Sequence, residues 1–99
     1  MIVTIFRTRF KLGNDDEYHA WNERMSALAA TMPGYISRKA FTAEDGERVI
    51  IVEFENEETQ AAWRNHPEHV EAQRLGRKKF YSEYDLKVCE LKRASRHKA

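Results

Sequence analysis

The segment from Trp63 to His69 carries the densest set of chemically capable side chains in the sequence. It reads Trp-Arg-Asn-His-Pro-Glu-His, so one indole and two imidazoles fall within seven residues. Imidazole titrates near neutral pH, and indole offers a large apolar face with one N–H donor. This segment is therefore the first candidate for a site that binds an aromatic molecule or moves a proton.

Structural roles for the same side chains stay open. His66 either caps a helix or lies in solvent, and His69 is equally well explained as a half-buried core histidine. Trp63 has the usual features of a core residue. Phe80, Tyr81 and Tyr84 follow at the end of the last predicted helix, where they line an aromatic pocket with Trp63 or belong to the core.

Other kinds of site are disfavoured. His66 and His69 have a spacing that places both on one helix face, but a third metal ligand and an HExxH pattern are missing. We therefore expect no metal site. There is no Gly-rich phosphate loop and no Gly-x-Ser-x-Gly motif, and Cys89 lies in a predicted strand without a base. Hydrolases and nucleotide enzymes are disfavoured for this reason.

The elements that must position these groups follow from hydrophobic periodicity. Residues 2–10, 35–42, 48–54 and 81–91 are predicted strands, and Asp45-Gly46 predicts a hairpin turn between the second and third. Apolar residues at helical spacing predict a helix after Asn14, which ends at Pro33-Gly34. Two further helices are predicted after Asn56 and between Asn65 and about Lys79.

Three caps are predicted for these helices. Asn14 with Glu17, and Asn65 with Glu68, have the spacing of a capping box, and Asn56 is a single cap. The resulting order is β-α-β-β-α-(α)-β. It predicts an α+β fold of the ferredoxin-like split βαβ type, a four-stranded antiparallel sheet with helices on one face.

The strands predict a second copy of the chain on the uncovered face of this sheet. A strand with one face in water should alternate apolar and polar residues, but residues 49–52 read Val-Ile-Ile-Val. We expect a homodimer through the sheet face, with a two-fold interface. Periodicity does not decide whether Ile50 or Ile51 points to the partner, and a monomer with a partly apolar sheet is the alternative.

Composition sets the remaining expectations. The chain has 99 residues, a net charge of +1 and one cysteine, so neither nucleic acid nor a membrane is an expected partner. We expect one domain over residues 1–92 and a basic tail over residues 93–99. The single cysteine and an N-terminus without signal-peptide features predict a cytoplasmic protein.

The pattern resembles the antibiotic biosynthesis monooxygenase (ABM) domain, in the dimeric α+β barrel superfamily. The resemblance covers nearly the whole chain, from Ile2 to about Lys92. Besides the order of elements, the segments that carry it are the helix exit Met32-Pro33-Gly34-Tyr35, the run Trp63…His66-Pro67-x-His69, and Gly76…Phe80-Tyr81-x-x-Tyr84.

This resemblance implies a barrel shared by two protomers and a pocket in each between sheet and helices. Members include cofactor-independent oxygenases of phenols and quinols, and haem-degrading enzymes. The first activity implies no cofactor, His69 as the catalytic base, and Trp63, His66, Phe80 and Tyr84 as residues that bind a small aromatic substrate. The haem-degrading pattern is not matched, because Gln73 stands ten residues after Trp63 where that pattern has His.

Two hypotheses of different classes follow. The first is a cofactor-independent monooxygenase acting on a phenol- or quinol-like molecule. The second is a stress-related dimeric module that binds a small molecule without turnover, because only His69, His66 and Arg7 offer polar chemistry. Haem capture through His69 or His66 is a weaker version of the second.

Overall fold

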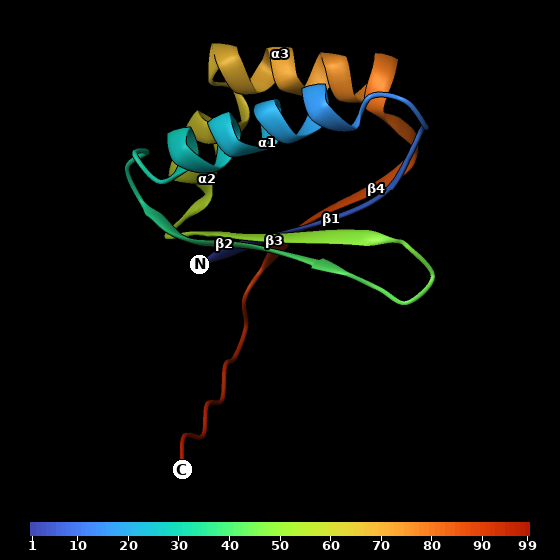
Figure 1. The fold of residues 1–99 in the computed structure, drawn as a ribbon. Helices are drawn as coiled ribbons and strands as arrows, with labels where there is room; N and C mark the ends of the chain where they lie inside the picture. The colour runs from blue at the N-terminus through green and yellow to red at the C-terminus, as the bar shows by residue number, and fades with distance from the viewer.

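A computed structural model describes residues 1–99 as a four-stranded antiparallel sheet with all helices on one face (Figure 1). The elements are β1 (Ile2–Phe10), α1 (Asp15–Ala29), β2 (Tyr35–Thr42), β3 (Arg48–Phe54), α2 (Glu57–Arg64), α3 (Pro67–Leu75), a π-helical turn η1 (Gly76–Phe80) and β4 (Tyr81–Glu90). The strand order is β2-β3-β1-β4. The predicted ferredoxin-like α+β fold is confirmed, and all four predicted strands are present.

Strand register divides the sheet into two faces. Thr4 pairs with Val52 and Phe6 with Ile50 and Leu86, so these residues share one face. We call it the helix face; it includes Ile2, Thr4, Phe6, Thr8, Arg38, Ala40, Arg48, Ile50, Val52, Phe54, Tyr84, Leu86 and Val88. The alternate residues form the outer face, among them Val3, Ile5, Arg7, Arg9, Lys39, Phe41, Val49, Ile51, Glu53 and Cys89.

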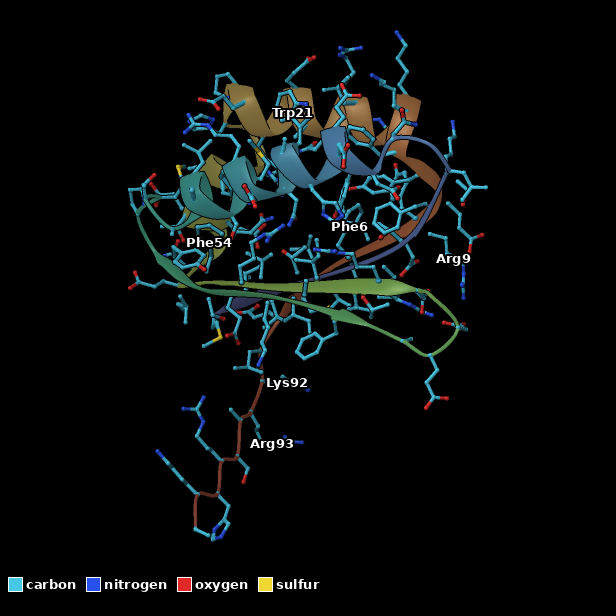
Figure 2. The ribbon with its side chains drawn as sticks, in the orientation of Figure 1. Phe6, Arg9, Trp21, Phe54, Lys92 and Arg93 are labelled. Atoms are coloured by element: carbon cyan, nitrogen blue, oxygen red, sulfur yellow. The ribbon has the colours of Figure 1, made fainter.

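The core lies between the helix face and the helices. Phe54 on β3 and Ala29 on α1 are both 0% exposed, and Trp63 on α2 is 5% exposed. In Figure 2, Phe6 and Phe54 point into this layer, while Lys92 and Arg93 lie on the final segment, which runs away from the sheet on the side without helices. Burial of these large side chains supplies most of the stability of the helix–sheet contact.

Asn14 stands at the N-cap position of α1 as predicted but lacks the predicted side-chain bond, and the predicted Asn65 cap is wrong. The Asn14 side chain makes no cap bond; its Nδ2 donates to the Lys79 carbonyl at 3.2 Å, and Glu17 pairs with the Lys79 ammonium. Asn65 ends α2, and His66 caps α3 by accepting the Glu68 backbone N–H at Nδ1, 3.1 Å away. The residue before a proline is disfavoured in helical conformation, which makes His66, not Asn65, the last non-helical residue.

The other boundary signals hold. Asn56 caps α2 by accepting the Thr59 N–H, and Gly46 adopts φ +90° in the predicted hairpin turn. The first helix ends at Ala29, a few residues before Pro33, and the last at Leu75, where η1 replaces its predicted final turn. None of the helices has the length and apolar composition needed to cross a membrane.

Candidate functional site

A cavity of about 220 Å³ lies between the helix face of the sheet and the helices. Its walls are mostly apolar, with Ile50 and Val52 from the sheet and Met25 and Ala72 from α1 and α3. Three β4 residues of the helix face also line it and are 42–51% exposed: Tyr84, Leu86 and Val88. The cavity is therefore open along β4, where no helix covers the strand.

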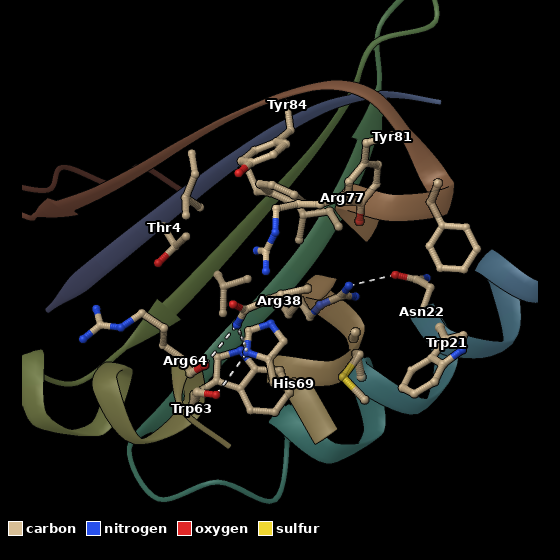
Figure 3. A pocket seen from close by; sticks show the side chains of 18 of the residues that line it. Thr4, Trp21, Asn22, Arg38, Trp63, Arg64, His69, Arg77, Tyr81 and Tyr84 are labelled. Carbon is tan, nitrogen blue, oxygen red and sulfur yellow. Dashed lines mark hydrogen bonds between the residues drawn. The ribbon is translucent and has the colours of Figure 1, made fainter. Parts of the chain in front are cut away.

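Trp63 and His69 form a stacked pair in the wall of this cavity (Figure 3). Their ring centroids are 4.0 Å apart and the ring planes differ by 13°. Trp63 is near the end of α2 and His69 is in the first turns of α3, so the helix break at Pro67 brings the two rings together. Stacking on a buried indole fixes the orientation of the imidazole.

One contact sets the tautomer of His69. Its Nδ1 lies 3.0 Å from the Trp63 carbonyl oxygen, which can only accept a hydrogen bond. Nδ1 therefore carries the proton and donates it. Gln73 Nε2 lies 3.4 Å from the same nitrogen but donates to the Arg64 carbonyl at 3.0 Å. Nε2 of His69 is left with a free lone pair, and no protein hydrogen bond uses it.

Burial lowers the pKa of His69, and the positive charge of Arg38 adds to this, while the bond to the Trp63 carbonyl opposes it. Desolvation disfavours the charged imidazolium. His69 is consequently neutral at physiological pH, which is the form that accepts a proton or a hydrogen bond at Nε2.

The charges around the cavity are positive only. Arg38, Arg64 and Arg77 line it, and no aspartate or glutamate does. Arg38 is half-buried on β2 and donates from Nη2 to Asn22 Oδ1 at 2.8 Å. Burial lowers the pKa of Arg38, but a guanidinium stays charged in proteins. The cavity is thus a small apolar space with a positive potential.

Two tyrosines close the end of the cavity nearest η1. Burial raises the pKa of both Tyr18 and Tyr81, so their hydroxyls stay protonated. Gly76 makes room for Tyr81, because a Cβ at that position would lie 2.4 Å from the Tyr81 ring. The glycine at the start of η1 therefore fixes how closely the turn approaches the aromatic wall.

The structure brings together four of the five residues that the sequence assigned to a site. Trp63, His69, Phe80 and Tyr84 line the same cavity. His66 does not line it, and its Nδ1 is used as the cap of α3. Arg7, a further polar candidate, lies on the outer face and pairs with Glu47.

Several cavity residues were not predicted. Arg38, Arg77, Asn22 and Trp21 all line it. In the sequence, Trp21 and Asn22 belong to an ordinary amphipathic helix, and Arg77 belongs to a basic run. Arg38 is the one of these residues that the sequence pattern could have identified. Strand alternation places it on the same sheet face as Ala40, and an arginine is unusual on a face that helices cover.

One family model and one curated relative match most of the chain. The model of the antibiotic biosynthesis monooxygenase family matches residues 1–75. The uncharacterised Bacillus subtilis protein YqjZ is 31% identical over 83 residues, which is 84% of this chain and 73% of that protein.

Solved structures give the same fold at low identity. A Deinococcus radiodurans protein aligns over 100% of both chains with a TM-score of 0.85 at 9% identity. SnoaB, a cofactor-independent oxygenase from Streptomyces nogalater, aligns over 94% of both chains with a TM-score of 0.77 at 14% identity. With the family model matching three quarters of its length, this chain belongs to the antibiotic biosynthesis monooxygenase family.

Proposed function

We propose that the protein is a cofactor-independent monooxygenase that oxidises a small phenol- or quinol-like aromatic molecule. The observation that carries the proposal is the state of His69: a neutral imidazole, fixed by Trp63 on one side, whose free Nε2 belongs to the wall of an apolar cavity. Such a base suits proton removal near neutral pH. SnoaB, with the same fold, is described as a cofactor-independent oxygenase.

In the proposed reaction His69 Nε2 takes the proton of the phenolic hydroxyl. The resulting anion is electron-rich at the ring carbon para to the oxygen. This carbon gives an electron pair to O₂, a C–O bond forms, and the peroxide takes the proton back from His69. Loss of the carbon-bound hydrogen with cleavage of the O–O bond then gives a quinone and one water per O₂. The apolar walls keep bulk water from the anion.

The test uses 1-naphthol and ¹⁸O₂. We expect one O₂ consumed per naphthoquinone formed, with one labelled oxygen in the product. His69→Ala should lower the rate by about 10²–10⁴, the usual effect of removing a general base. His19→Ala is the matched control, since His19 is exposed on α1 and does not line the cavity. Turnover that continues without O₂, or that survives in His69→Ala, contradicts the proposal.

A binding module without turnover is the second candidate. The observation that favours it is the lack of a second group for proton transfer, since His69 is the only histidine that lines the cavity and no aspartate or glutamate does. A screen of aromatic compounds by thermal shift separates the two. Compounds that raise the melting temperature without O₂ uptake support the binding module.

Haem would find a single imidazole ligand in this cavity. His69 Nε2 is the one imidazole nitrogen available there, because His66 does not line the cavity and its Nδ1 is used as a cap. In a haem-binding version of the module, His69 would be the residue that holds the iron.

We also propose that a second copy covers the outer face. Val3, Ile5, Val49 and Ile51 form an apolar strip across β1 and β3 that no helix covers, and Phe41 beside it is 48% exposed. Such patches mark interfaces. A two-fold dimer closing the strip would bury about 800 Å² per partner, the usual size of a stable interface.

The exposed thiol of Cys89 is consistent with a cytoplasmic, reducing environment.

A further inference from the structure

The arginines of the folded part differ in how their charge is balanced. Four arginines that do not line the cavity pair with carboxylates: Arg7 with Glu47, Arg9 with Asp45 and Glu83, Arg24 with Glu68, and Arg74 with Glu71. Arg38, Arg64 and Arg77, which line the cavity, form no ion pair. The positive charge at the cavity therefore has no counter-charge from the protein, and an anionic ligand would supply one.

Arg48, the one arginine of the folded part that neither lines the cavity nor forms an ion pair, adds to this imbalance from the helix face, where it pairs with Thr8 across β1 and β3. Its Nε is buried without a hydrogen-bond partner, and its guanidinium lies 5.5 Å from the centre of the Tyr18 ring. Its positive charge also acts on Arg38, where it helps to lower the pKa. Because His69 is neutral, nothing in the cavity wall offsets these charges. A partly desolvated charge without a counter-ion is costly, which favours occupation by an anionic group.

Arg38 is the member best placed to bind that group. It stands on the helix face opposite Val52, in the middle of β2, so the sheet fixes its backbone. One of its five N–H groups donates to Asn22 Oδ1 at 2.8 Å, and no other side-chain hydrogen bond is made. A planar guanidinium with free donors matches a carboxylate, which it binds through two parallel hydrogen bonds. Figure 3 shows Arg77 reaching into the space between Tyr84 and the Trp63–His69 pair, with the Arg38 guanidinium to one side of it, joined to Asn22.

We propose that Arg38, oriented by Asn22, is the anchor for the carboxylate of an aromatic acid, so that the ligand of this protein is an anion. The aromatic part lies against the apolar walls, and Arg77 adds positive potential. The inference rests on the proposed function only for the choice of this cavity as the ligand site. It holds whether the ligand is oxidised or merely bound.

The test compares 2-naphthoate with 2-naphthamide by isothermal titration calorimetry. The two probes share ring and shape and differ in charge, and neither has the phenolic hydroxyl that oxidation needs. We expect the wild type to bind the acid at least about tenfold more tightly than the amide, because hydrogen bonds to charged groups are stronger than neutral ones. Arg38→Gln should remove the preference, and Arg38→Lys should keep part of it, since lysine retains the charge without the fork.

Arg74→Gln is the matched control. Arg74 is exposed on α3, pairs with Glu71 and does not line the cavity, so this variant should keep the wild-type preference. Circular dichroism checks that each variant is folded. If Arg38→Gln does not fold, Arg38→Lys decides, and a wild-type preference in that variant contradicts the two-bond anchor.

Three outcomes overturn the inference. They are equal binding of acid and amide, no binding of the acid at millimolar concentration, and a preference that persists in folded Arg38→Gln. Tighter binding of 2-naphthyl phosphate than of the acid overturns the choice of carboxylate. The monooxygenase proposal fails separately: Arg38-dependent binding of the acid without O₂ uptake on hydroxynaphthoates would leave the anion site standing and remove the oxygenase.

Discussion

Ile50 and Ile51 are neighbours on β3 and lie on opposite faces of the sheet. Ile50 is 6% exposed on the helix face, where it joins the core and the cavity wall, whereas Ile51 lies on the outer face, which nothing in this chain covers. On the helix face the chain supplies its own covering layer, and the remaining space is a site. On the outer face it leaves apolar side chains that no other part of the chain covers.

The two faces also use charge differently. On the outer face Arg7 and Arg9 pair with Glu47 and Asp45 of the hairpin between β2 and β3, so the polar rim of the apolar strip is neutralised. On the helix face Arg38 has no carboxylate partner. A neutralised rim around an apolar strip is suited to a second protein surface, and an unpaired cation in a cavity is suited to a small anion.

The largest effect that separates the faces is expected from a charge on β3. Ile50→Lys places an ammonium in the core, where burying an unpaired ion costs several kcal/mol, so the protomer should unfold. Ile51→Lys is its control and should leave the protomer folded or make its unfolding depend on protein concentration. Circular dichroism and sedimentation measure both. A folded Ile50→Lys variant would contradict the assignment of Ile50 to the core. A wild type that sediments as a monomer would contradict the outer face as an interface.

The next largest difference in stability is expected between alanine substitutions of two phenylalanines, one on each face of the sheet. Phe54 is 0% exposed on the helix face and Phe41 is 48% exposed on the outer face. Phe54→Ala should lower the free energy of unfolding by about 3–5 kcal/mol, the usual cost of emptying a core site of this size. Phe41→Ala should cost much less in urea denaturation at low protein concentration, and more as dimer forms. Equal costs at all concentrations would contradict the assignment of the two faces.

A smaller effect concerns pH. The pKa of His69 is lowered in the folded state by burial and by the charge of Arg38, with His66 contributing. Below pH about 6.5 the unfolded chain therefore takes up this proton before the folded chain does. The stability linked to His69 is complete above that pH and is lost as pH falls toward the folded pKa. Between about pH 7.5 and about pH 5, the urea midpoint of the wild type should therefore fall more than that of His69→Gln.

The smallest effect is expected at the outer-face ion pair. Arg7 is about half exposed in the single chain, and ion pairs at the protein surface add little to stability. Arg7→Gln should leave the urea midpoint of the protomer unchanged and weaken the dimer measurably in sedimentation, since the pair rims the proposed interface. An altered midpoint with unchanged sedimentation would assign the pair to the protomer fold instead.

The sequence predicts strands and the fold well here because the signals are local. Asp45-Gly46 specifies its turn, and Pro67 restricts His66 and so marks the helix break. Prediction from the sequence fails where a tertiary contact competes with a local one. Asn14 has the spacing of a cap, but the Lys79 carbonyl, distant in sequence, takes its side chain.

The site was predicted in part for the same reason. Trp63 and His69 stand close together in sequence, so their types and spacing identified them. Arg38 and Asn22 meet only after β2 and α1 are packed, and neither has a local pattern that announces a ligand site. The two-sided apolar run of β3 likewise does not say which isoleucine faces the helices, because alternation assigns a face only when one face is polar.

The π-helical turn η1 has a consequence for how such a chain can change length. Its closing bond runs from the Tyr81 N–H to the Gly76 carbonyl, one residue further than in an α-helix. A π turn is thus equivalent to an α-helical turn with one inserted residue, held between the end of α3 and the start of β4. Arg77 and Phe80, both in this turn, line the cavity. A single-residue deletion here would rewind the turn and rotate these side chains while leaving the rest of the helix hydrogen-bonded. The closed end of the cavity can therefore change shape at η1 with little effect on the sheet.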